Sequence, residues 1–92
     1  MKYTEFVAKA EALGFIATFG DYGSFIKVLN ERGARIGTVY GILDYDFDLP
    51  LQDQDLSLWG SNAKRRLINH YIMQLASTEI KNRGKMPIKE AA

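Results

Sequence analysis

FIATFGDYGSFIKVLNERGARIGTVY, residues 15–40, decides the fold of this chain. The stretch divides into three β-rich runs, 15–19, 24–29 and 35–40, separated by Gly-containing turns at 20–23 and 30–33. Loops of about four residues that contain Gly are typical of hairpins between antiparallel strands. The stretch therefore predicts a three-stranded antiparallel meander. Apolar residues occur at both alternating positions of the runs, so both faces of the predicted sheet are partly apolar.

An amphipathic helix is predicted directly before the meander. Its apolar residues recur at the three- and four-residue spacing of one helix face: Tyr3, Phe6, Val7, Ala10 and Leu13. Thr4 is expected to cap the N-terminus of this helix. Gly14 is expected to end it in the left-handed conformation.

Two further elements are predicted after the meander. Residues 44–49 alternate strictly between aspartate and an apolar residue, which favours a fourth, edge-like strand or an extended segment halted by Pro50. A second helix is expected to be capped by Ser61 or Asn62 and to run to about Glu79. Its apolar stripe consists of Leu67, Ile68, Tyr71, Ile72, Leu75 and Ala76.

These elements predict the α+β class, with the order α-β-β-β-(β)-α. We expect a three- or four-stranded antiparallel meander with both helices packed on one face. The 92 residues fit one domain, residues 1–80, followed by a flexible basic tail, residues 81–92, in which little can pack.

The composition indicates a cytoplasmic protein. The chain has no cysteine, which excludes disulfides and thiolate metal sites. Its N-terminal residues lack the plan of a signal peptide, and no apolar run has the length of a membrane span, so we expect no membrane partner.

No motif in the sequence indicates catalysis or metal binding. Asp44, Asp46, Asp48 and Asp55 partly match a calcium loop, but its sixth position is Leu49 instead of glycine. The single histidine, His70, is predicted on the solvent side of the second helix with no nucleophile or orienting carboxylate. We therefore expect no enzyme, no metal, no cofactor and no small-molecule substrate.

Charge is unevenly distributed along the chain. Residues 44–60 contain five aspartates and no base, whereas residues 61–92 contain seven bases and two acids. Lys64, Arg65 and Arg66 fall in the first turn of the second helix, where positive charge opposes the helix dipole. The aspartate segment, an acidic protein partner or a nucleic acid could offset that cost.

The nucleic-acid alternative has support in the order of the elements. Helix, three strands and helix is also the order of the double-stranded-RNA-binding domain, whose second helix begins with basic residues. The turn at 20–23 lacks the Pro and His of that family, and the five aspartates of 44–60 would repel RNA. Nucleic acid is therefore the alternative partner, and Lys64, Arg65 and Arg66 would be its contacts.

Two helices cover only one face of so small a sheet, so the other face is expected to be an exposed apolar patch. Such patches mark association, and the acid-then-base layout suits reciprocal pairing of two copies. We therefore predict a protein-interaction module that either forms a homo-oligomer, such as a homodimer, or binds a host or phage protein. The residues expected to form the interface are Phe15, Phe19, Phe25, Tyr40, Tyr45, Phe47 and Trp59.

Two stretches resemble small proteins encoded by phages and prophages of Gram-positive bacteria. Residues 2–15 are similar to the opening of those proteins, a Phe-containing helix that ends in Ala-Leu-Gly-aromatic. Residues 67–83 are similar to their helix-ending Tyr-Ala-x-Thr-Pro-x-x-x-Arg pattern, with Leu75-Ala76 in place of Tyr-Ala and Glu79 in place of Pro. The resemblance implies a prophage accessory protein, whose partner would be a second copy or a host or phage protein.

Overall fold

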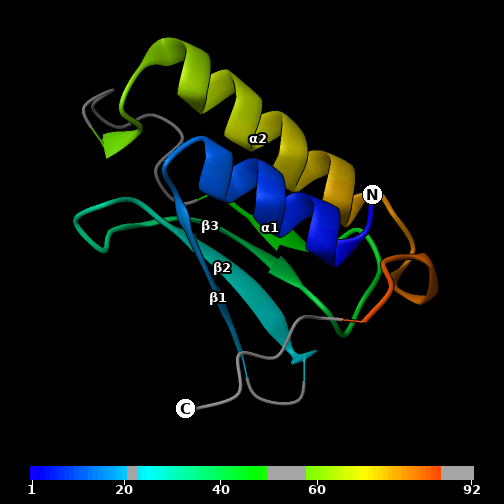
Figure 1. Ribbon diagram of the computed structural model, residues 1–92. Coiled ribbons are helices and arrows are strands. Elements are labelled where there is room, and N and C mark those ends of the chain that lie inside the picture. The colour runs from blue at the N-terminus through cyan, green and yellow to red at the C-terminus, as the bar shows by residue number, and fades with distance from the viewer. Residues whose placement is uncertain (21–22, 50–57, 86–92) are drawn as a thin grey trace.

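The computed structural model describes residues 1–20, 23–49 and 58–85. Within these ranges the chain forms two α-helices and one antiparallel sheet of four strands in the order β1-β2-β3-β4 (Figure 1). This arrangement confirms the predicted fold class, including the fourth strand. The elements are α1 (Tyr3–Ala12), β1 (Ile16–Phe19), β2 (Phe25–Leu29), β3 (Arg35–Tyr40), β4 (Phe47–Asp48), α2 (Asn62–Ala76) and the 3-10 turn η3 (Ile80–Asn82).

A bulge in β3 shapes the centre of the sheet. Val28 pairs with Gly37, whereas the next residue, Leu29, pairs with Arg35, so Ile36 is the extra residue. Both Ile36 and Gly37 are buried. A Cβ on Gly37 would lie 2.8 Å from Cδ1 of Ile72, so glycine at this position allows α2 to approach β3 closely.

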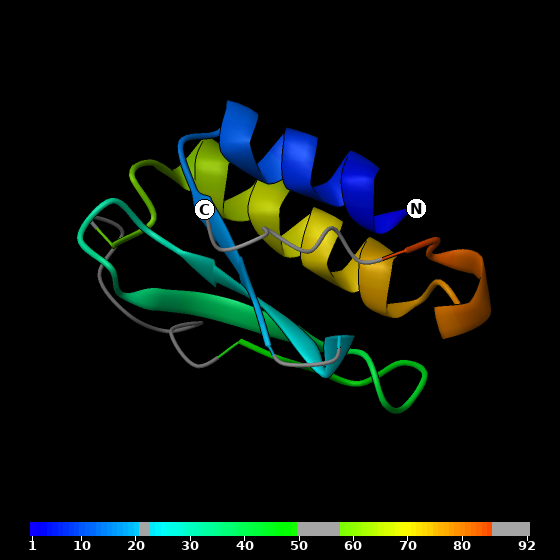
Figure 2. The ribbon, with the colours of Figure 1, turned by 60° about the horizontal axis from the view of Figure 1, so that its bottom comes forward.

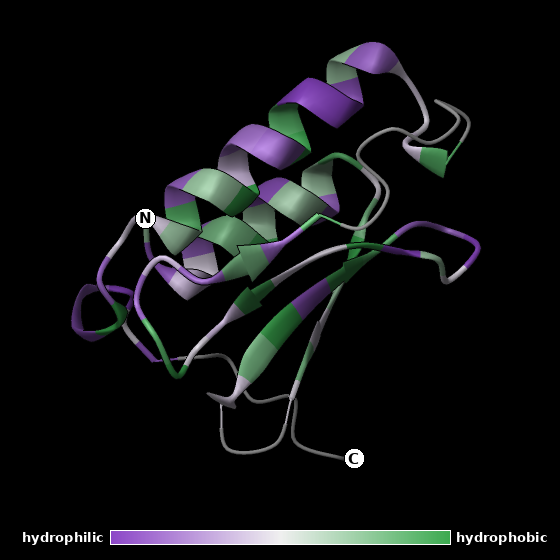
Figure 3. Ribbon diagram, turned by 180° about the vertical axis from the view of Figure 1, so that it is seen from behind, coloured by the Kyte–Doolittle hydropathy of each residue, from purple (hydrophilic) through white to green (hydrophobic). Residues whose placement is uncertain are grey.

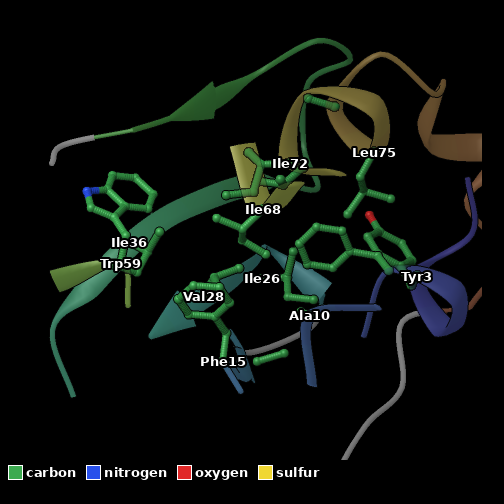
Figure 4. Packing of buried hydrophobic residues seen from close by; sticks show 14 residues of the cluster. Tyr3, Ala10, Phe15, Ile26, Val28, Ile36, Trp59, Ile68, Ile72 and Leu75 are labelled. Atoms are coloured by element: carbon green, nitrogen blue, oxygen red, sulfur yellow. The ribbon is translucent and has the colours of Figure 1, made fainter. Parts of the chain in front are cut away.

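Both helices lie on the same face of the sheet, as predicted (Figures 1 and 2). The two helices pack against each other; α1 also contacts β1, and α2 also contacts β3 and β4. The core fills the space between the two layers, where buried side chains of the helices meet those of the strands (Figure 4). Its members include Phe6, Ala10, Ala17, Ile26, Val28, Ile36, Val39, Ile68, Ile72 and Leu75.

The two helices differ from the prediction in three places. Helix α1 begins one residue before Thr4, and its N-cap is Lys2, which makes no side-chain capping bond. Helix α2 ends at Ala76 instead of Glu79, because Ser77 is the C-cap and the chain continues into η3. Leu67, predicted in the apolar stripe of α2, is 41% exposed.

Other capping predictions are confirmed. The Ser61 hydroxyl accepts a hydrogen bond of 3.1 Å from the backbone N–H of Lys64, which is the N-cap geometry expected for α2. Gly14 follows α1 with a φ of 88°, in the left-handed region that favours glycine.

Packing continues beyond residue 80. Arg83, placed by the sequence analysis in a flexible tail, is completely buried, and its backbone carbonyl accepts a 2.8 Å hydrogen bond from the N–H of Tyr3. The packed part of the chain therefore reaches at least Arg83. Residues 86–92 of the expected tail lie outside the described residues.

Candidate functional site

The seven residues expected to form one interface lie in different parts of the structure. Phe15 and Trp59 belong to the core, with only 5% and 1% of their surfaces exposed, so their assignment to an interaction face was wrong. Phe15 is buried because it enters the core directly after α1, and Trp59 because it packs against the core just before α2. Phe19 also points to the helix-covered side, since it pairs with the buried Ile26.

The face of the sheet without helices carries Phe25 and Tyr40, which pair across β2 and β3 and are half-buried. Polar groups lie beside them. The ammonium of Lys27 lies 5.1 Å from the ring centre of Phe25, and Arg35 donates to Asp48 at 3.0 Å in an ion pair. This open face is therefore mixed in character and differs from the apolar patch that was expected.

Exposed apolar side chains gather instead beside the β4 edge of the sheet. Of the seven large apolar residues that are exposed within the described ranges, five lie on β4, on the β3–β4 connection or on the neighbouring side of α2. We call these five the β4-edge surface: Ile42, Leu43, Tyr45, Phe47 and Met73. Tyr45 and Phe47 were expected at an interface, whereas Ile42, Leu43 and Met73 were missed.

The β3–β4 connection is attached to the C-terminal end of α2. The backbone N–H of Tyr45 donates to the carbonyl of Ala76 at 3.1 Å. A carboxylate oxygen of Asp44 accepts from the N–H of Ile80 at 2.8 Å. Met73 precedes Ala76 by three residues, so it lies one turn away on the same side of α2. The five members of the surface thus come from two segments held side by side.

Tyr45 has an unusual backbone. Its φ is 63°, which makes it the single non-glycine residue with positive φ among those described. This conformation costs about 1–2 kcal/mol for an L-residue, and it interrupts the extended chain that the alternation of residues 44–49 predicted. Two hydrogen bonds offset that cost: Tyr45 donates to Ala76 at the end of α2, and Asp44 accepts from Ile80 in η3. The Tyr45 ring stays exposed.

Arg83 links the end of β3 to the end of α2, the two elements that hold the β3–β4 connection in place. Its Nη1 donates to the carbonyl of Tyr40 at 2.9 Å, at the end of β3, and its Nη2 donates to the carbonyl of Ala76 at 3.2 Å, at the end of α2. Its Nε donates to the carbonyl of Thr78 at 2.8 Å. These bonds tie the start of the β3–β4 connection to the helix end on which that connection rests.

The basic cluster at the start of α2 does not form one patch. Successive residues of a helix are about 100° apart, so Lys64, Arg65 and Arg66 spread over about 200°. Lys64 and Arg65 are half-buried, and Arg66 is exposed. Within residues 58–85 and the other described ranges, none of the three forms an ion pair.

The expected pairing of this cluster with the aspartate segment does not occur for the aspartates that are described. Asp48 pairs with Arg35 on the sheet, and Asp44 binds η3 near the opposite end of α2. Asp53 and Asp55 lie outside the described residues. The positive charge at the start of α2 is therefore not offset by Asp44 or Asp48.

Lys64 faces a cleft of about 140 Å³ between the start of α2, the end of α1 and the β2–β3 turn. Its Nζ and Oε1 of Glu31 both lie 3.7 Å from the position that a Cβ on Gly14 would take. The cleft is thus bordered by a base and an acid, which form no ion pair with each other. The indole nitrogen of Trp59, which also borders the cleft, is buried and has no acceptor among the described residues.

His70 is exposed on α2, and its ring centre lies 5.9 Å from that of Tyr71. Among the residues that the structure describes, His, Asp and Glu side chains form no group of three that could share a metal ion. Neither described helix combines the length and apolar character that crossing a membrane requires.

Comparison with known proteins does not identify a relative. No protein-family model, curated protein or solved structure matches this chain. The resemblance to phage and prophage proteins therefore stays a prediction.

Proposed function

We propose that the protein is a self-associating interaction module and that the β4-edge surface forms its contact with a second copy. The observation that carries this proposal is the exposure of Ile42, Leu43, Tyr45, Phe47 and Met73 on neighbouring segments, namely β4, the β3–β4 connection and the part of α2 to which that connection is bonded. Exposed apolar residues on neighbouring segments are typical of sites of association, whereas apolar residues scattered singly over a surface are not.

Charge favours a second copy as the occupant of the surface. The β3–β4 connection carries Asp44 and Asp46 among its apolar residues, and the same chain carries a basic helix start with no ion pair among the described residues. Two copies related by a two-fold axis present both features to each other. A single kind of chain therefore supplies an apolar contact and complementary charge.

Nucleic acid is less well supported as a partner. Phosphate binding draws its strength from several bases that face one backbone. Here Lys64 faces the cleft beside Gly14, while Arg66 lies about 200° further round α2. The bases on this helix turn are therefore divided between two sides.

The test is sedimentation equilibrium of the wild-type protein and of Leu43→Ser over a wide range of concentration. Leu43 is 64% exposed, so the substitution leaves the fold intact and removes apolar contact area. We expect the wild type to form dimers and Leu43→Ser to associate roughly ten-fold more weakly or worse, since burying one leucine contributes about 1.5–3 kcal/mol.

The matched control is Ile16→Ser. Ile16 is 45% exposed, and it lies on β1 at the opposite edge of the sheet from β4. We expect this variant to dimerise like the wild type. A wild-type protein that stays monomeric at millimolar concentration contradicts the proposal, as does equal weakening by both substitutions. Monomers that bind an unrelated protein or an oligonucleotide through this surface would also contradict it.

A further inference from the structure

The two edges of the sheet differ in how well they are protected against pairing with another strand. β4 has two residues, with Asp46 directly before it and Asp48 at its end, and short, charged strands resist pairing. β1 (Ile16–Phe19) has four residues, pairs with β2 without a register shift, and contains no charge and no proline. Hydrophobic and pale colours run along β1 in Figure 3, without the deep purple of charged residues. β1 is therefore the less protected edge.

The hydrogen-bond pattern indicates which backbone groups of β1 point outward. The N–H of Gly20 donates to the carbonyl of Phe25 at 2.8 Å. In an antiparallel pair such bonds recur at every second residue, so Gly20 and every second residue before it are bonded to β2. Ala17 and Phe19 lie between these residues, so their N–H and C=O groups point away from the sheet. Among the described residues, these groups have no backbone hydrogen-bond partner.

We infer that β1 forms a further contact between copies of this chain, in which β1 of one copy pairs antiparallel with β1 of another. If the pairing is centred on Thr18, Ala17 of each copy lies opposite Phe19 of the other. Each such pair can exchange two backbone hydrogen bonds. Thr18 pairs with Lys27 on the open face of the sheet, so the two Thr18 side chains meet on that face. Contacts between threonines on neighbouring strands are favourable.

Charge makes a second copy of the same strand a suitable occupant of this edge. Antiparallel self-pairing places each residue near the two-fold axis opposite itself or a close neighbour, so a charged strand repels its own copy. At β4 the same pairing would set Asp46 of each copy against Asp48 of the other. At β1 the residues that meet are the uncharged Ala17, Thr18 and Phe19.

This contact goes beyond the proposed function, because it does not use the β4-edge surface. β1 and β4 are opposite edges of the sheet, so one copy can make both contacts at the same time. Dimers formed through the β4-edge surface can then join end to end through β1. Pairing of two short strands buries little apolar side-chain surface, so we expect the β1 contact to need a higher protein concentration than the β4-edge contact.

Amide hydrogen exchange, measured residue by residue, tests the backbone contact. We expect the N–H groups of Ala17 and Phe19 to exchange roughly ten-fold more slowly at about 1 mM protein than at about 10 μM. The N–H groups of Ile16 and Thr18 are bonded to β2, so they should change much less and serve as internal controls. The Leu43→Ser variant should show the same protection. Protection of Ala17 and Phe19 that is absent, or that does not depend on concentration, overturns the inference.

Thr18→Glu should block this pairing and leave the single chain folded. Within one copy the new carboxylate lies opposite Lys27, whereas between copies two carboxylates meet. Thr18→Val is the matched control, because it introduces no charge. In sedimentation velocity at about 1 mM protein, we expect the wild type and Thr18→Val to form species larger than a dimer, whereas Thr18→Glu stops at the dimer.

Two sedimentation results contradict the β1 contact: a wild type that stops at the dimer, or equal assembly of the Glu and Val variants at Thr18. Neither result affects the proposed function, which the Leu43→Ser variant tests separately. Conversely, if Leu43→Ser leaves the wild-type dimer unchanged while Thr18→Glu abolishes it, the β1 contact stands and the β4-edge contact fails.

Discussion

At the scale of single residues, the burial of Arg83 could not be predicted from the sequence. It is one of seven bases in residues 61–92, next to a glycine, and no apolar periodicity distinguishes it from exposed Lys81 or Lys85. The helix-ending pattern of the phage proteins ends on this arginine, but that resemblance implies nothing about its burial. Its position depends on the carbonyl of Tyr40, 43 residues away, together with those of Ala76 and Thr78, a combination that only the folded chain brings together. Ser61, whose partner is three residues away, was predictable because the capping interaction is local.

Replacing Arg83 by methionine is expected to destabilise the protein by about 3 kcal/mol. The substitution keeps much of the buried volume but leaves the carbonyls of Tyr40 and Thr78 without the Arg83 donor, while the carbonyl of Ala76 keeps only the N–H of Tyr45. Urea unfolding followed by circular dichroism measures the loss. Lys85→Met is the control, because Lys85 is exposed and its replacement should change stability by less than about 0.5 kcal/mol. Equal stability of the two variants would show that the hydrogen bonds of Arg83 contribute nothing.

At the scale of elements, periodicity was a good guide wherever one face of an element is buried. Strand β3 has the predicted bounds, and α1 and α2 lie where their apolar spacing placed them. The connection between β3 and β4 was harder to predict, because its conformation depends on hydrogen bonds to α2 and η3. The alternation of polar and apolar residues along the sequence carries no information about these bonds. Alternation also does not show which aromatic residues the helices cover. All seven were therefore assigned to one interface, although Phe15 and Trp59 pack in the core.

The close approach of α2 to β3 gives a prediction for Gly37→Ala. The new methyl group would lie 2.8 Å from Cδ1 of Ile72 and 3.0 Å from Cδ2 of Leu49, so one of these side chains must move. We expect a loss of about 1–3 kcal/mol in the free energy of unfolding. Ile72→Val removes the nearest of those atoms, so the alanine should cost about 1 kcal/mol less in that background. An additive double variant would mean that Ile72 is not the obstacle.

At the scale of the whole molecule, self-association links stability to concentration. A dimer formed only by the native chain shifts the unfolding equilibrium toward the native state, by about 2.7 kcal/mol when the free protein is a hundred-fold above its dissociation constant. The Tm of the wild type should therefore rise steadily as protein concentration increases. The apolar β4-edge surface and its nearby acids, Asp44 and Asp46, would then be part of what keeps so small a domain folded.

The Leu43→Ser variant distinguishes the stability that dimer formation adds from the stability of the monomer itself. At high dilution the variant and the wild type should unfold at nearly the same temperature, because an exposed side chain contributes little to the monomer. As concentration increases, the wild-type Tm should rise while that of Leu43→Ser stays almost level, and Ile16→Ser should follow the wild type. Differential scanning calorimetry across about a hundred-fold range of concentration measures all three curves. A wild-type Tm independent of concentration would mean that the exposed apolar residues beside β4 contribute nothing to stability through association.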